Sequence, residues 1–390
     1  MKRFVLVLLI SLVLLSACAP QNNTPGTPTA LTTPTATNSP TMVKTTLVKT
    51  TLVLTTLTLT DALGREVSLP NPPKRIVITG KALIMVVDAV YMFPEAPERI
   101  AALGNAGQGT SNFISLIDPS YAAKATLQQD AGAEQIAAAN PDLVILKSSL
   151  AETLGKSLEA LDIPVIYVDF ETPEQYVRDL AILGKVFQNE SRAQQIAEFY
   201  QNKVTGVQTA LQGEAPGTSG VGKPRVLMLY YSDTGGAVAF NVPPMTWMQT
   251  QIVQLAGGEP VWASANPANG WTKVSLEQIA AWDADQIFII SYFKNPSEVV
   301  TSLKSNPQWQ ALRAVQQGHL YAFPGDLYSW DQPDARWILG LSWLATRLHP
   351  DRFSQVDIVQ ETKQFYQVLY GLDAQFFEEK IHPTFKGDLP

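Results

Sequence analysis

Two lysines in the first half of the chain follow buried strands that the sequence predicts. Lys81 comes two residues after the strand at 75–79, and Lys147 comes directly after the strand at 143–146. Ligands of open α/β sheets bind at the carboxyl ends of the strands, so both ammonium groups are expected at such an edge. There they would favour a negatively charged ligand group. The alternative is that each is a solvated loop lysine or a charge at a helix end.

Aromatic residues are dense in the second half of the chain, in or beside the predicted loops. Tyr231 and Tyr292 follow strands, and Trp271 and Trp330 lie in loops near them. Rigid aromatic walls with a few polar groups suit a bulky organic ligand. Any one of these rings could instead pack in the core. The prediction is therefore a set, with Trp271, Tyr292 and Trp330 as a ligand wall and Tyr231 beside them.

The residues that catalysis or direct metal binding would need are scattered. His319, His349 and His382 are not spaced as metal ligands, with one another or with a carboxylate pair. The glycine-containing loop at 104–109 follows a strand but misses the dinucleotide-binding spacing. No nucleophile elbow is present, and the only cysteine is Cys18. We therefore expect no enzyme, no cofactor and no metal site made by side chains alone, although tyrosines of the second half could ligate ferric iron.

An internal repeat indicates the elements that would position these residues. Residues 134–146 recur as residues 277–289, and each copy reads as a short helix, a turn and a buried strand. Apolar runs that alternate with helix-period segments indicate parallel sheets of βα units. The predicted strands are 75–79, 99–103, 143–146 and 165–168, then 225–230, 237–240, 286–290 and 319–323. The predicted fold class is α/β, with two Rossmann-like lobes of parallel sheets.

A long helical region separates the two halves. One helix is predicted to start at Thr172, whose hydroxyl can cap it, with proline at the next position. A second helix, at 191–212, keeps apolar residues on one face and would span roughly 30 Å at 1.5 Å per residue. We expect a first lobe at 57–190, this single helix as a stiff strut between the lobes, and a second lobe at 223–390.

The first 18 residues are typical of an export signal. Lys2 and Arg3 precede an apolar run that is shorter than the roughly 20 residues a membrane span needs. The run ends in Leu-Ser-Ala-Cys, which is similar to the lipobox of bacterial lipoproteins and implies a lipid on Cys18. The alternative is a signal-peptide thiol without a role. Residues 19–56 are rich in Thr and Pro and are predicted to form a flexible linker.

Charge and cysteine content narrow the class of protein further. The chain carries 28 basic and 35 acidic residues, a net charge of -7, which argues against nucleic-acid binding. With a single cysteine, an exported chain has no intramolecular disulfide to support its fold. The fold must therefore rest on its own hydrophobic core.

Several segments occur in an order and spacing that match a known family. They are residues 60–67, 73–77, 134–144, 255–258, 275–279 and 366–371. Over residues 57 to about 370 the chain resembles the substrate-binding lipoproteins of ATP-driven importers, in the class that handles iron-siderophores, haem and cobalamin. The resemblance implies a monomer with two lobes bridged by a helix and the ligand held between them.

Glu134 and Glu277 occupy equivalent positions in the repeat. In the family that the chain resembles, a glutamate on each lobe docks into arginines of the membrane permease, and these two match by position. A carboxylate near a helix start is favoured by the helix dipole and can form charge-assisted pairs. The alternative is that each glutamate only stabilises its own helix end.

The resemblance implies an extracytoplasmic, membrane-anchored lipoprotein, in the periplasm or at the cell surface. It would capture a metal chelate, such as a ferric siderophore, haem or cobalamin, and deliver it to the permease of an ABC importer. The alternatives are a lipid-anchored ligand sensor, a binder of a small oxyanion or a bare metal ion, and a surface-tethered hydrolase, against which the histidine positions argue. Arg336, near Asp331 and Asp334, is expected to form a local ion pair.

Overall fold

A computed structural model describes residues 56–108, 111–212, 222–266 and 270–389. The predicted export signal, Cys18 and nearly all of the predicted linker lie outside the described residues. All the described residues belong to one compact unit. Within the described ranges, no helix has the length and apolar character that crossing a membrane requires.

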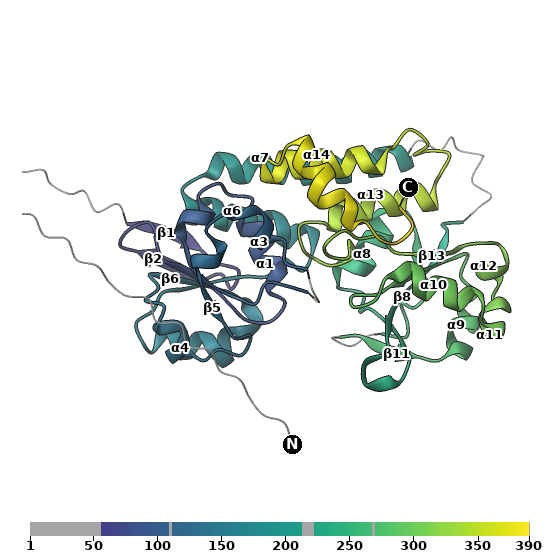
Figure 1. Ribbon diagram of the computed structural model, residues 1–390, viewed down its shortest axis with the longest axis horizontal. Coiled ribbons are helices and arrows are strands. Elements are labelled where there is room, and N and C mark those ends of the chain that lie inside the picture. The colour runs from purple at the N-terminus through teal and green to yellow at the C-terminus, as the bar shows by residue number, and fades with distance from the viewer. Residues whose placement is uncertain (1–55, 109–110, 213–221, 267–269, 390) are drawn as a thin grey trace, which may run out of the picture. The chain divides into compact units, whose positions relative to one another are not determined.

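The first lobe, on the left in Figure 1, is built on a five-stranded parallel sheet in the order β5-β4-β3-β6-β7. Its strands are β3 (Ile76–Ile78), β4 (Ile100–Gly104), β5 (Ala125–Leu127), β6 (Leu143–Lys147) and β7 (Val165–Val168). Central parallel strands are buried on both faces, which explains their continuous apolar runs. The helices of this lobe are α1 (Leu83–Val90), α2 (Ala96–Arg99), α3 (Ile114–Ile117), α4 (Ala133–Ala137) and α5 (Lys156–Glu159). A separate antiparallel hairpin, β1 (Leu57–Thr60) and β2 (Glu66–Leu69), precedes the sheet.

The second lobe contains a mixed sheet in the order β11-β9-β8-β12-β13, with β10 also paired to β8. Its strands are β8 (Arg225–Ser232), β9 (Ala239–Val242), β10 (Glu259–Pro260), β11 (Thr272–Val274), β12 (Gln286–Ile290) and β13 (Leu320–Ala322). β8, β12 and β13 are parallel, whereas β9 and β11 are antiparallel to their neighbours. The connection from β8 to β9 is too short for the crossover that a parallel pair needs, so these strands form a hairpin.

The helices of the second lobe flank this mixed sheet. They are α8 (Met248–Leu255), α9 (Leu276–Trp282), α10 (Pro296–Lys304), α11 (Pro307–Gln310), α12 (Arg313–Gln316) and α13 (Trp337–Leu348). The predicted fold class, two α/β lobes joined by a long helix, is confirmed. The second sheet departs from the predicted parallel pattern: β9, which overlaps the strand predicted at 237–240, runs antiparallel to β8, and β11 was not predicted.

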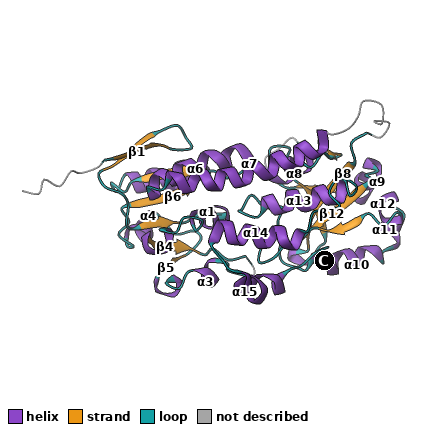
Figure 2. Ribbon diagram, turned by 90° about the horizontal axis from the view of Figure 1, so that it is seen from above, coloured by secondary structure: helices purple, strands orange, loops and turns teal. Residues whose placement is uncertain are grey.

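Two long helices connect the lobes. After α6 (Pro173–Phe187), which Thr172 caps by accepting a hydrogen bond from the Gln175 N–H, α7 runs without a break over Glu190–Gln212. Figure 2 shows α7 passing from α6 of the first lobe to α8 and α13 of the second. α14 (Ile358–Tyr370) packs along α7 through an ion pair between Lys203 and Glu361. α14 then reaches the first lobe, where the Tyr370 hydroxyl donates to the Asp88 carbonyl at 3.0 Å, and α15 (Ala374–Phe376) follows it.

One hydrophobic core continues from the first lobe into the second. Tyr176 of α6 lies 4.9 Å from Tyr200 of α7, and Tyr200 stacks on Trp337 of α13 at 5.4 Å, measured between ring centroids. Phe113 of the first lobe lies 5.6 Å from Tyr366 of α14. Because close-packed interiors transmit strain, a shift of one lobe would disturb this shared core.

Candidate functional site

Four aromatic side chains gather at the carboxyl ends of strands β8 and β12. Tyr230 stacks on Tyr292 at 4.7 Å and lies 5.0 Å from Trp271, and Trp247 meets Trp271 edge-on at 5.6 Å. All four residues are half-buried. The structure thus brings the predicted pair Trp271 and Tyr292 together and adds Tyr230 and Trp247. We call these four residues the aromatic wall.

The buried carboxylate of Asp331 accepts a hydrogen bond from Tyr292 of the aromatic wall and from two neighbouring side chains. The Tyr292 hydroxyl donates to Asp331 Oδ2 at 2.8 Å, Gln249 Nε2 donates to the same oxygen at 3.2 Å, and Ser329 Oγ donates to Oδ1 at 2.6 Å. Burial raises the pKa of Asp331, and the three hydrogen bonds oppose that shift. Burial and the nearby Asp331 carboxylate raise the pKa of Tyr292 well above its usual value. Because the Tyr292 hydroxyl donates its proton to Asp331, ligation of ferric iron by Tyr292 would require the loss of this hydrogen bond.

Trp330 does not belong to this wall. Its side chain is completely buried and packs edge-on against Phe385 at 5.8 Å. A Cβ on Gly340 would come within 2.2 Å of the Trp330 carbonyl oxygen, so the backbone also fits closely against α13. The structure corrects the prediction for Trp330, because a ring packed inside the lobe cannot contact a ligand at the strand ends.

Tyr231 lies beside the wall, as the sequence suggested, but its neighbours are different. Its ring is half-buried and packs edge-on against Phe240 of β9 at 5.9 Å. Lys294 Nζ lies 6.0 Å from the centre of the Tyr231 ring and forms an ion pair with Asp233. The loop after β12 is therefore tied to the β8–β9 hairpin.

Lys81 is exposed in the loop between β3 and α1. Gly80 and Ala82, on either side of it, have φ values of +112° and +54°, so the loop turns sharply around the lysine. Such positive φ angles favour glycine and strain other residues. Lys81 keeps an accessible ammonium group at the carboxyl edge of the first sheet, where the sequence predicted one.

Lys147 differs from the prediction in its surroundings. It is buried at the end of β6, and its ammonium group forms an ion pair with Glu171 and lies 3.4 Å from the Met85 sulfur. A ligand anion there would have to compete with the Glu171 carboxylate. The charge of Lys147 is thus already neutralised within the first lobe.

The strand ends of the two lobes meet at a pair of glutamines. Gln108, after β4, and Gln332, after β13, exchange two amide hydrogen bonds of 3.0 Å each. Nearby, the Tyr328 hydroxyl donates to the Ala106 carbonyl at 2.9 Å and accepts from the Phe113 N–H at 3.0 Å. Loops from the carboxyl ends of both sheets are therefore in direct contact.

Glu134 and Glu277 occupy the second positions of α4 and α9, and both are exposed. In each helix the glutamine that follows accepts a hydrogen bond at the helix start, from the Gly132 N–H at 3.0 Å or from the Ser275 N–H at 2.9 Å. A backbone hydrogen bond at the helix start and one to Ser275 lower the pKa of Glu277. Two carboxylates therefore stand in equivalent local settings, one on each lobe.

Equivalent arginines hold the two repeat units on their sheets. The backbone N–H of Arg75 donates to Asp142 at 2.8 Å, and that of Arg225 donates to Asp285 at 2.8 Å. The guanidinium of Arg75 binds the Asn140 carbonyl at 2.8 Å, and that of Arg225 binds the Trp282 carbonyl, also at 2.8 Å. The sequence repeat is thus a structural repeat that presents α4 and α9 in the same way.

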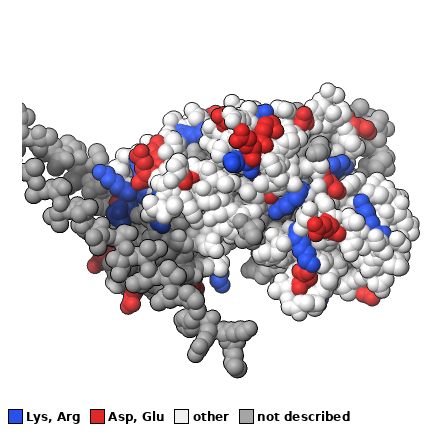
Figure 3. Space-filling model, in the orientation of Figure 1, with Lys and Arg blue, Asp and Glu red and all other residues white. Residues whose placement is uncertain are grey.

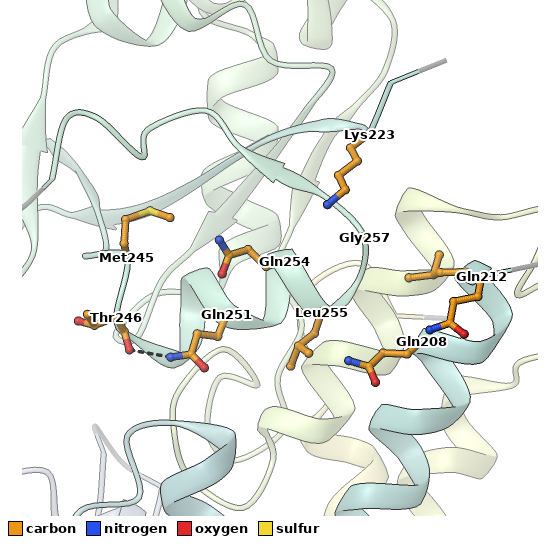
Figure 4. A pocket seen from close by; sticks show the side chains of 10 residues that line it. Gln208, Gln212, Lys223, Met245, Thr246, Gln251, Gln254, Leu255 and Gly257 are labelled. Atoms are coloured by element: carbon orange, nitrogen blue, oxygen red, sulfur yellow. Dashed lines mark hydrogen bonds between the residues drawn. The ribbon is translucent and has the colours of Figure 1, made fainter. Parts of the chain in front are cut away.

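A cavity of about 660 Å³ lies beside α8 (Figure 4). It opens beside the last turn of α7 and along α8, and none of the predicted site residues lines it. Four glutamines, Gln208, Gln212, Gln251 and Gln254, line it together with the apolar side chains of Leu211, Met245 and Leu255. Among the described residues, no group of three or more His, Cys, Asp and Glu side chains could hold a metal ion.

The exposed charges of both signs are mixed. On the face that Figure 3 shows, basic and acidic side chains are interspersed, and the described residues form no continuous basic stripe there. A stripe of that kind is the electrostatic footprint of nucleic-acid binding. The surface charge therefore agrees with the net charge of the chain, which also argued against nucleic-acid binding.

Comparison with known proteins gives relatives that are named as binding proteins. The chain is 22% identical to the molybdate-binding protein MolA of Haemophilus influenzae over 350 residues, which cover 80% of this chain and 90% of MolA. It is 29% identical to the vitamin B12-binding protein of Salmonella typhimurium over 157 residues, 40% of this chain and 54% of that protein. A periplasmic solute-binding protein from Veillonella parvula superposes with a TM-score of 0.65 at 23% identity, covering 84% of this chain and 99% of that structure.

The family match agrees with the resemblance that the sequence motifs indicated. The model of the periplasmic binding protein family matches residues 101–327, which run from β4 to the loop after β13. Members of this family bind solutes outside the cytoplasm and are not enzymes. The chain belongs to the periplasmic binding protein family.

Proposed function

We propose that this protein captures a metal chelate between its two lobes and delivers it to the permease of an ABC importer. The aromatic wall is the observation that supports this proposal most strongly. It offers four half-buried rings at the carboxyl ends of β8 and β12, where open α/β sheets bind ligands. Such a surface suits a bulky organic ligand better than a small ion.

The chelate is proposed to be a ferric siderophore, haem or cobalamin. The exposed ammonium of Lys81 would meet an anionic group of the ligand at the first lobe, while Trp271 and Tyr292 would contact its organic part. Lys147 would contribute only if the ligand displaced Glu171. The vitamin B12-binding protein among the relatives supports a ligand of this size.

A small oxyanion is the second candidate ligand. MolA, whose alignment covers 80% of this chain, is named for binding molybdate. Lys81 would serve an oxyanion as well as it serves a chelate, but an oxyanion would leave the aromatic wall without a role. The two ligand classes therefore differ in whether binding depends on Trp271.

Delivery is proposed to use Glu134 and Glu277 as docking residues, because the two carboxylates are exposed and equivalently presented. Cys18 is proposed to carry the lipid that keeps the protein at the membrane. A sensor that shares the fold would bind the same ligand but would not need both glutamates for uptake.

The test is a fluorescence titration of the protein with ferric siderophores, haem, cobalamin, molybdate and ferric ion. The proposal expects tryptophan quenching by one chelate, with binding weakened in Tyr292→Phe and unchanged in Tyr321→Phe. Tyr321 is a half-buried tyrosine of β13 that stacks on Phe288, outside the wall. Binding of molybdate alone, insensitive to Tyr292→Phe, would favour the oxyanion.

A further inference from the structure

A fully buried arginine joins the two lobes. Arg336, the residue before α13, directs Nη1 to Asp88 Oδ2 at 2.5 Å and Nε to Asp326 Oδ1 at 2.8 Å. Its Nη1 also lies 3.4 Å from Asp334 Oδ2. Asp88 belongs to α1 of the first lobe, whereas Asp326 and Asp334 belong to the loop between β13 and α13. One guanidinium thus bridges carboxylates of both lobes.

Aromatic rings from both lobes enclose this guanidinium. Its central carbon lies 4.7 Å from the centre of the Phe113 ring and 4.8 Å from that of Tyr328. Phe113 is in the first lobe and Tyr328 in the second. The Tyr366 hydroxyl accepts from Arg336 Nε at 3.1 Å and donates to Asp326 Oδ2 at 2.5 Å. Cation–π contacts and hydrogen bonds therefore hold the guanidinium plane from several sides.

Three carboxyl groups surround the single guanidinium of this cluster. They belong to Asp88, Asp326 and Asp334, and all four side chains are fully buried. Burial raises the pKa of Asp88 to about 6 and that of Asp334 well above its usual value, while Arg336 opposes both shifts. Separating the lobes would break the ion pair between Arg336 and Asp88 and the contact of the guanidinium with the Phe113 ring.

The same loop also places groups at the candidate ligand site. Tyr328 contacts the backbone at Ala106 and Phe113, Gln332 pairs with Gln108, and Asp331 holds the Tyr292 hydroxyl. Tyr328, Asp331 and Gln332 lie within the stretch from Asp326 to Arg336, and both ends of this stretch belong to the buried cluster. The position of the wall relative to the first lobe therefore depends on this loop.

We infer that Arg336 is a positioning residue that pins the two lobes at one separation, so that the strand ends of both sheets are in place before a ligand arrives. Arg336 acts through its ion pair with Asp88 in the first lobe and through its ion pairs with Asp326 and Asp334 in the second lobe. Tyr328 reinforces this connection with two hydrogen bonds across the lobes. The inference concerns the separation of the lobes and does not depend on the identity of the ligand.

The test measures the distance between spin labels on the two lobes in the absence of ligand. The full-length chain would carry Cys18→Ser, Ala138→Cys and Ala281→Cys, since both alanines are exposed, one next to α4 and one in α9. Pulsed electron double resonance should give one narrow distance distribution for this parent. Asp88→Asn and Tyr328→Phe should each broaden the distribution or shift its maximum.

Matched variants inside the second lobe are the controls. Tyr321→Phe makes the same exchange as Tyr328→Phe, and Arg347→Met removes an arginine that contacts the Asp388 carbonyl and the rings of Trp343 and Tyr321. Both should keep the parent distribution. Arg336→Met should broaden it most, and if that variant does not fold, the two conservative variants decide.

Three results would overturn the inference. One is a parent distribution that is already broad. Another is a pair of folded Asp88→Asn and Tyr328→Phe variants with the parent distribution. The third is equal broadening in Tyr321→Phe, which would show a general loss of rigidity instead of a loss of the contacts between the lobes.

Discussion

The side chains of Gln108 and Gln332 form a reciprocal amide pair, with two hydrogen bonds of 3.0 Å between the lobes. Gln108 follows β4 of the first sheet and Gln332 follows β13 of the second. The pair marks the place where loops from the strand ends of the two sheets touch. The aromatic wall and Lys81 both lie at strand ends of these sheets, so the binding proposal concerns one region built from both lobes.

Trp271→Ala should weaken binding of the captured chelate by tenfold or more. The substitution removes a ring that contacts Tyr230, Tyr292 and Trp247, and aromatic pairs contribute about 0.5–1.5 kcal/mol each beyond the area they bury. Isothermal titration would measure the dissociation constant. Trp282→Ala, a change to another half-buried tryptophan that lies on α9, is the control and should keep the affinity. Equal losses of affinity in both variants would show that the aromatic wall is not part of the binding site.

Lys81→Gln should weaken binding of an anionic ligand without changing the melting temperature. The ammonium group is exposed, so its loss leaves no buried partner unpaired. The affinity of the wild type should also fall with added salt more steeply than that of the variant, because screening weakens exposed charge pairs. Lys185→Gln, another exposed lysine at the far end of α6, is the control. The same salt dependence in Lys81→Gln and the wild type would argue against an anionic contact.

Glu134→Gln and Glu277→Gln should lower uptake while leaving ligand affinity unchanged. Both side chains are exposed in first helical turns, so the amide should preserve the fold and remove only the charge. Uptake of radiolabelled ligand into cells would measure the effect, and the double variant should be the slowest. Glu298→Gln is a matched control, since Glu298 is also exposed in the first turn of its helix, α10. Normal uptake by the double variant would support the alternative that the protein is a ligand sensor.

Mild acidification should stabilise the protein through Asp88. Its pKa is raised from 3.8 to about 6 in the folded state, so between these values the folded state binds more protons than the unfolded state. This contribution is fully present below about pH 4 and is lost as the pH rises through about 6. From pH 7 to pH 5 the free energy of unfolding should rise by on the order of 1 kcal/mol more in the wild type than in Asp88→Asn.

Urea unfolding at the two pH values would measure that difference. The pKa values of Asp118, Asp285 and Glu277 are lowered, so their contributions are lost only as the pH falls below the usual carboxylate range, outside this window. Asp179→Asn is a second comparison, because Asp179 is also buried with a raised pKa but lies within the first lobe. The same pH response in the wild type and Asp88→Asn would contradict the prediction.

The regular elements could be predicted because their signals are local. The predicted strands at 165–168 and 286–290 match β7 and β12, and the helix predicted at 191–212 matches α7 within one residue. Strand β5 was missed because its three residues are largely exposed and carry no apolar run. β9 was predicted as a strand, but its antiparallel direction depends on pairing with β8, which the pattern of a single strand does not contain.

The site was only partly predictable because its contacts join distant residues. Lys147 has its partner Glu171 24 positions away, and Arg336 has Asp88 248 positions away. The local spacing of Asp334 and Arg336 indicated an ion pair but not the partner in the other lobe. For Trp330, the loop sequence suggested exposure, whereas the fit of Gly340 and Phe385 around it decides its burial.

Native mass spectrometry of the protein with a mixture of ferric siderophores, haem, cobalamin, molybdate and ferric ion tests the central claim most directly. The account predicts one bound chelate per protein chain, with the occupancy strongly reduced in Trp271→Ala and unchanged in Trp282→Ala. A folded protein that binds only molybdate or ferric ion, or a chelate whose occupancy is the same in Trp271→Ala, would contradict it.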